Sequence, residues 1–204
     1  MDTGPVGLVF PVPGAPLSAQ QVEERIRTKP DGTVRSQNLV SPIHRDSAGR
    51  MRIEWHIEAD GDELAEIVIL VDPVASSIVW LAVGQKVAYP DAVPPSPGGE
   101  FRIGFPAVVQ PPLARNWPMK TDALGTRVIE GIEVEGVRTV QTSEDQPPLT
   151  AVHEVWRCPK LHVTLRIEVS GPTWKQTAKL QNVEWREPDP ALFVIPSEYT
   201  IQEG

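Results

Sequence analysis

The chain has 204 residues, a length that suits one domain with a core of its own. Its formal net charge is −8 at pH 7 and it holds no block of Lys or Arg, which argues against nucleic acid as a partner. Its 22 prolines argue against long helices, and no apolar run approaches the roughly 18 residues of a membrane-spanning helix.

Residues 1–17 are expected to form a flexible N-terminal segment, followed by a single β domain over residues 18–204. The segment has neither the basic n-region nor the apolar h-region of a secretory signal. The residues alone therefore leave two possibilities open, a cytosolic protein or an exported one whose signal has been removed.

The stretch "SAQQVEERIRTK" allows two interpretations. Ser18 and Gln21 have the spacing of a capping box, and Val22 and Ile26 lie four residues apart, as on one face of a helix. The two apolar residues also share strand parity, and the turn signal Pro30-Asp31-Gly32 would pair this stretch with the next one. We favour a strand.

Apolar residues alternate with polar ones through most of the remaining chain, as in antiparallel strands with one buried face. "RMRIEWHIE" and "KLHVTLRIEV" show the pattern most clearly, and a change of apolar parity near Gln181-Asn182 indicates a β-bulge. The pattern predicts a mainly β protein, a single strongly curved antiparallel sheet with little helix. Strands are expected at 20–28, 33–44, 50–58, 65–72, 77–83, 124–130, 132–142, 150–157, 160–170 and 174–186.

Residues 84–118 interrupt this pattern with eight prolines. Phe101, Phe105 and Trp117 lie among them, and large aromatic residues are unusual in a solvated linker. We expect a proline-rich loop that docks as a lid over the mouth of a concave apolar face. An ordinary ordered connection between two halves of the sheet is the alternative.

Three of the histidines are candidate ligands for a metal ion or a ligand head group. A turn at residues 46–49 would set His44 opposite Met51, on the face of Trp55, where it could orient a ligand head group. A hairpin turn at Cys158-Pro159 would set His153 and His162 on a solvated polar face, without a third metal ligand.

No catalytic or metal-binding motif was found in the sequence. The single cysteine, Cys158, excludes an intramolecular disulfide, and no base is placed to activate its thiol. Asp60, Asp62 and Glu63 lack the spacing of an EF-hand loop and are expected to form a solvated turn. We predict a protein that is not an enzyme and that uses no metal or cofactor.

The stretches "HRDSAGRMRIE", "LVDPVASSIVW", "ALGTRVIEGIEVEGVRTVQT" and "EPDPALFVIPSEYTI" resemble a group of uncharacterised, usually exported bacterial proteins. That group is similar in fold to the bacterial lipoprotein-carrier superfamily (LolA/LolB-like). The resemblance implies a half-open β-barrel around an apolar cavity, a periplasmic or secreted location, and a lipid or lipidated protein as partner.

The resemblance also implies a role for the C-terminal stretch. Asp189 would cap one short helical turn begun by Pro190, with Leu192 and Phe193 plugging one end of the sheet. Tyr199 and Ile201 would then return along a sheet edge.

Two functions remain open. The first is the binding of an apolar ligand, such as a lipid or lipidated peptide, in the concave sheet. The second is a structural or protein-interaction domain of the cell envelope, in which large side chains fill the interior and leave no ligand site. The candidate ligand-binding residues are His44, Trp55, Trp156, Leu161, Leu165, Phe101 and Phe105.

Overall fold

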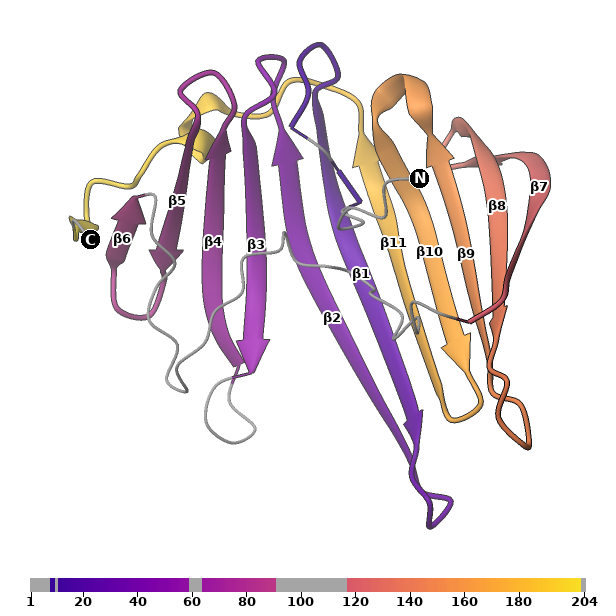
Figure 1. Cartoon of the computed structure of the whole chain (residues 1–204). Coiled ribbons are helices and arrows are strands. Elements are labelled where there is room, and N and C mark those ends of the chain that lie inside the picture. The colour runs from indigo at the N-terminus through magenta and orange to yellow at the C-terminus, as the bar shows by residue number, and fades with distance from the viewer. Residues whose placement is uncertain (1–7, 10, 59–63, 91–116, 203–204) are drawn as a thin grey trace. The chain divides into compact units, whose positions relative to one another are not determined.

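The computed structural model describes residues 8–9, 11–58, 64–90 and 117–202, and in these ranges the chain is mainly β (Figure 1). One 12-stranded, largely antiparallel sheet has the order β12-β6-β5-β4-β3-β2-β1-β11-β10-β9-β8-β7, and β12 pairs with β6 in parallel. The sheet does not close into a barrel, since β12 and β7 are its two edges. The predicted single-sheet class is confirmed.

The strands have the following bounds: β1 Leu17–Thr28, β2 Val34–Arg45, β3 Met51–Glu58, β4 Leu64–Asp72, β5 Ser77–Ala82, β6 Val87–Pro90, β7 Met119–Ile129, β8 Ile132–Thr142, β9 Thr150–Cys158, β10 Val163–Gly171, β11 Trp174–Glu184 and β12 Thr200–Ile201. Two short 3₁₀ turns accompany them, η1 at Pro159–Leu161 and η2 at Pro190–Phe193.

The chain divides into two compact units. The strands β1, β2 and β11 contribute residues to both, and each unit is described separately below. The first unit comprises Met1–Val9, Gln21–Val40 and Pro106–Gln181, and the second comprises Phe10–Gln20, Ser41–Phe105 and Asn182–Gly204.

The first long strand, β1, settles the choice between helix and strand in favour of a strand. Its burial alternates, with Leu17, Gln21 and Glu23 buried and Val22 and Ile26 only half-buried. The buried face of β1 is therefore partly polar. Gln21 and Glu23 can be buried there because Gln21 Nε2 donates a hydrogen bond of 2.9 Å to Glu23 Oε1. The alternating pattern alone predicts apolar residues at such positions.

In the second unit, β3 and β4 confirm the alternating stripe. Met51 pairs with Val71 and Ile53 with Ile69, and all four side chains are buried. Because cross-strand partners share one face of a sheet, these residues form a continuous apolar surface.

The C-terminal segment covers the opposite face of β4, together with residues of β5 and β6. Ile195 and Tyr199 pack against a buried cluster formed by Val68, Leu70 and Leu81. Ala88 belongs to the same cluster. The segment thus protects apolar surface that the strands alone would expose.

The expected capping at the start of this segment is confirmed. Asp189 Oδ1 accepts a hydrogen bond of 2.9 Å from the backbone N–H of Ala191, and Pro190 opens η2. Phe193 is half-buried, with the guanidinium of Arg50 5.2 Å from its ring centroid. Ile201 pairs with Ala88, so the chain does return along an edge of the sheet.

The expected loop at 84–118 is wrong at its start, where Val87–Pro90 forms β6 and pairs with β5. The lid and Phe101 and Phe105 fall on residues 91–116, outside the described ranges, and so does the acidic turn at 60–63. Within the segment 1–17, Leu8 and Val9 are buried, and Val9 forms a β-bridge with Val163.

Candidate ligand-binding face

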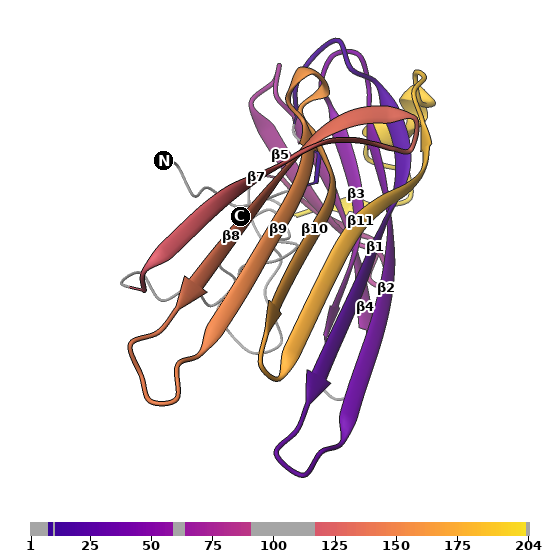
Figure 2. The same ribbon diagram turned by 90° about the vertical axis from the view of Figure 1, so that its right-hand side faces the viewer.

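The strands β8, β9 and β10 of the first unit lie side by side and carry two faces of different character (Figure 2). Val155 pairs with both Val137 and Ile167, and successive residues of a strand point to opposite faces. The register therefore assigns each side chain to a face. The apolar face consists of Val137, Thr139, Gln141, Ala151, His153, Val155, Ile167, Val169 and, from β11, Ala178. The charged face carries Arg138, Val140, Val152, Glu154, Glu168 and Ser170.

The apolar face changes in burial from one side to the other. Ile167, Val169 and Ala178 are 0% exposed. Val137 and Val155, on the neighbouring strands, are only half-buried. The apolar surface thus continues from a closely packed part at β10 and β11 to the half-buried side chains of Val137 and Val155 on β8 and β9.

The position of His153 differs from the prediction. His153 pairs with Val169 rather than Thr164, and it lies on the apolar face. The reason is that η1 occupies the hairpin, with His162 in the left-handed conformation at φ 50° after it, and that the register shifts between Thr164 and Arg166. The predicted polar face shared by the two histidines is wrong.

Burial lowers the pKa of His153, so its ring is neutral at pH 7. Its Nε2 atom is buried and has no hydrogen-bond partner, and the same holds for Oε1 of Gln141. Both residues lie on the apolar face, which is therefore not uniformly apolar.

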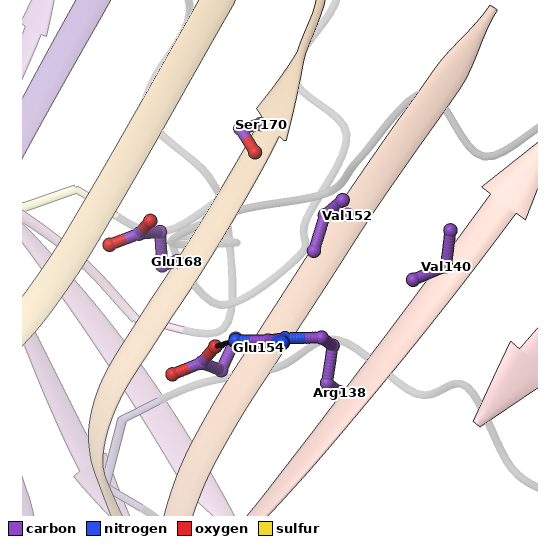
Figure 3. Close-up of a pocket in the computed structure, with 6 residues that line it drawn as sticks. All are labelled: Arg138, Val140, Val152, Glu154, Glu168 and Ser170. Carbon is purple, nitrogen blue, oxygen red and sulfur yellow. Dashed lines mark hydrogen bonds and ion pairs between the residues drawn. The ribbon is translucent and has the colours of Figure 1, made fainter. Parts of the chain in front are cut away.

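The charged face contains a pocket of about 280 Å³, and Figure 3 shows its lining side chains on three neighbouring strands. Its charges are paired. Arg138 Nη2 lies 2.8 Å from Glu154 Oε2, while Glu168 is bonded by Arg166 at 2.7 Å and by Lys175 at 2.9 Å. The charged side chains that line this pocket are therefore already held in ion pairs.

Hydrogen bonds outweigh burial at the two carboxylates of this pocket. Burial raises the pKa of Glu154, but bonds from Trp156 and Arg138 leave it below its ordinary value. Burial likewise raises the pKa of Glu168, and the bonds from Lys175 and Arg166 bring it below its ordinary value. Both groups are therefore ionised at neutral pH.

Glu154→Gln is expected to lower the free energy of unfolding at pH 7 by about 1 kcal/mol. A carboxyl with a lowered pKa stabilises the fold above its unfolded pKa, and this contribution disappears as the pH falls through the folded value. The difference between the wild type and the variant should therefore close below about pH 4.5. Urea denaturation from pH 7 to pH 3 measures it, and a difference that is constant over this range would contradict the assignment.

Trp156, a predicted ligand-binding residue, also lies on the charged face. Its Nε1 donates a hydrogen bond of 2.7 Å to Glu154 Oε1, and the guanidinium of Arg127 lies 3.6 Å from the ring centroid. The ring covers Gly136, its cross-strand partner. Leu165 is 0% exposed at the register shift in β10, and Leu161 is half-buried in η1.

His44 and Trp55 belong to the second unit. The predicted register of His44 is wrong by one residue, because Arg45 pairs with Met51 and His44 with Arg52. His44 therefore lies on the face opposite Trp55, where its Nδ1 is 2.9 Å from Oγ of Ser18 and burial lowers its pKa. Trp55 is half-buried opposite Ile67.

Arg45 was missed by the sequence analysis. Its side chain is 0% exposed, its Nε donates a 2.7 Å hydrogen bond to the carbonyl of Ala15, and burial lowers its pKa to about 10. The only sequence signal is parity, since Arg45 alternates with the buried Ile43.

Within residues 8–9, 11–58, 64–90 and 117–202, no group of three or more His, Cys, Asp or Glu side chains is placed to hold a metal ion. No helix in the same part of the chain is long and apolar enough to cross a membrane.

No protein-family model and no curated protein matches the sequence. Among solved structures, LprF from Mycobacterium bovis is 10% identical with a TM-score of 0.37, and the alignment covers 92% of this chain and 91% of that one.

Two further structures are similar over most of their length. A putative outer membrane lipoprotein-sorting protein domain from Vibrio parahaemolyticus is 10% identical, with a TM-score of 0.26 and coverage of 88% and 90%. A LolA superfamily protein from Nitrosomonas europaea is 8% identical, with a TM-score of 0.21 and coverage of 92% of both chains.

Proposed function

We propose that this chain is a non-enzymatic binding domain that holds an apolar or amphipathic ligand, a lipid or a lipidated peptide, against the apolar face of β8 to β11. The observation that carries the proposal is the burial gradient on this face. Half-buried Val137 and Val155 continue the fully buried surface of Ile167 and Val169, and ligand sites are lined mostly by apolar side chains with a few polar groups among them.

The charged face supports a role without catalysis. Ser170 stands opposite Lys175, the nearest basic side chain by register, but the ammonium of Lys175 is held 2.9 Å from Glu168. A serine becomes nucleophilic when an adjacent base takes its proton, and a paired ammonium is no such base. Cys158 is buried.

A direct test is mass spectrometry of the purified protein under native conditions. We also propose a periplasmic or secreted location, as the resemblance to exported proteins implies, so the protein is purified from that fraction of its source. A bound lipid or lipidated peptide is expected. Protein found only in the cytoplasmic fraction would contradict the location.

Val155→Asp is expected to weaken binding of a fluorescent fatty-acid probe at least about tenfold, because a carboxylate replaces apolar contact surface. Val152→Asp is the matched control, since Val152 is half-buried on the same strand but belongs to the charged face. Fluorescence titration measures both, with circular dichroism to verify folding.

Val137→Asp and its control Val140→Asp repeat the comparison on β8. A probe that responds to the controls and not to the variants of the apolar face would place the ligand on the charged face and contradict the proposal.

The edge strand β7 favours a second candidate, a protein-interaction domain. Nearly all its residues are exposed, with Val128 68% and Met119 61% exposed, and an edge strand offers unpaired backbone groups to another chain. Purified protein without lipid, with probe binding unchanged in all four variants, favours this function.

A further inference from the structure

The apolar face contains two hydrogen-bonding atoms that the fold leaves without partners. In the part of the chain that the structure describes, four buried side-chain polar atoms make no hydrogen bond. Two of them, Oε1 of Gln141 and Nε2 of His153, belong to this one face. Buried polar groups of this kind reduce stability unless a partner is supplied.

The two side chains are neighbours. Gln141 pairs with Ala151 and His153 pairs with Thr139, so Gln141 and His153 stand diagonally across β8 and β9. Diagonal positions on one face lie within reach of a shared small group. Gln141 is only 7% exposed, so water does not readily replace a missing partner.

Nearby polar groups on the same strands do not show this defect. The hydroxyls of Thr121 and Thr139 lie 3.2 Å apart, and on the charged face Arg138 and Glu154 are bonded at 2.8 Å. Among the described residues of β8 and β9, the buried side-chain atoms without a partner are thus Oε1 of Gln141 and Nε2 of His153, both on the apolar face.

We propose that Gln141 and His153 bind the polar end of an amphipathic ligand, a neutral head that carries a hydroxyl or amide group. The inference rests on the proposed function, because the apolar body of the same ligand would lie on Val137 and Val155. A hydroxyl or amide N–H donates to Oε1 of Gln141, and its oxygen accepts from the N–H of the imidazole of His153.

The charge of the head follows from the same residues. The carbonyl oxygen of Gln141 accepts hydrogen bonds and repels a carboxylate. Burial holds the pKa of His153 below its ordinary value and keeps the ring neutral at pH 7. The residues of the apolar face include no Lys or Arg, so an anionic head would find no cation among them.

The first arm of the test measures the free protein. Gln141→Leu and His153→Phe replace each unpartnered group by an apolar one of similar size, and the urea midpoint is expected to stay equal or rise. Thr139→Val is the matched control on the same face, where a hydrogen bond is lost and the midpoint should fall. A fall in both Gln141→Leu and His153→Phe shows that the two atoms have partners and overturns the proposal.

The second arm measures binding of two probes, a pyrene-labelled long-chain alcohol and the matching pyrene-labelled alkane. Wild-type protein is expected to bind the alcohol about tenfold more tightly than the alkane. The variant that carries both Gln141→Leu and His153→Phe should bind the two probes equally. Wild-type protein that binds both probes equally overturns this inference and leaves the proposed function intact. Wild-type protein that binds neither overturns both.

Discussion

Gly49→Ala is expected to lower the free energy of unfolding by about 3 kcal/mol. Gly49 has φ +87°, a region that costs an L-residue energy, and an added Cβ would lie 2.9 Å from the carbonyl carbon of Val12 and 3.1 Å from the nitrogen of Pro13. Both contacts are with backbone, so neither can be relieved by a side-chain rotation. The effect is measured by urea denaturation, followed by circular dichroism.

The turn that holds Gly49 explains why relaxation is difficult. The N–H of Gly49 donates to the carbonyl of Asp46 at 3.1 Å, and the N–H of Gly14 donates to the carbonyl of Ser47 at 2.9 Å. The hairpin turn between β2 and β3 is thus tied to the N-terminal segment that passes over it.

Gly32→Ala is the matched control. Gly32 has nearly the same dihedral, φ +83°, but nothing lies within 4 Å of its added Cβ. Gly32→Ala should therefore lower the free energy of unfolding by only about 1 kcal/mol, because an alanine there is strained by the left-handed conformation alone. Equal effects of the two substitutions would show that the approach of Val12 does not constrain this turn.

The sequence predicts strands most accurately where turn residues bound them on both sides. β8 begins at Ile132 as predicted, because Glu130 and Gly131 both take positive φ, 49° and 75°, in the preceding hairpin. The parity change in β11 is similarly explained by Asn182 at φ 53°. Glycine and asparagine tolerate this conformation, and the sequence therefore marks such turns in advance.

Register was less predictable, because it depends on how many residues a turn uses. A single added residue between β2 and β3 moved His44 to the opposite face. η1 and the shift after Thr164 did the same to His153, which left the predicted solvated face for the apolar one. The candidate site therefore contains a residue that sequence reasoning had assigned to solvent.

Pairings between distant segments were not predictable from local patterns. β12 pairs Thr200 with Val87, and neither segment shows enough alternation to mark it as a strand. The sequence also gives no signal that Oε1 of Gln141 lacks a hydrogen-bond partner, because this depends on which side chains lie next to it on the neighbouring strands. Such features appear only when the register is known.

Gly136→Ala is expected to lower the free energy of unfolding by about 3 kcal/mol. An added Cβ at Gly136 would lie 2.6 Å from the Cη2 and Cζ3 atoms of the Trp156 ring. Moving the ring away would disturb the 2.7 Å bond from its Nε1 to Glu154 and its contact with the guanidinium of Arg127. Urea denaturation measures the change.

Once the Trp156 ring is removed, Gly136→Ala should raise the free energy of unfolding instead of lowering it. In a Trp156→Ala background the steric overlap is gone, and alanine is more favourable than glycine within a strand by roughly 0.5–1 kcal/mol. A double-mutant cycle isolates this coupling. Gly84→Ala, with nothing within 4 Å of the added Cβ, is the control for a tolerated substitution. Additive effects of Gly136→Ala and Trp156→Ala would show that the position of the Trp156 ring does not require a glycine at residue 136. Coupling would show that Gly136 is required because the Trp156 ring, fixed by Glu154 and Arg127, leaves no room for a side chain.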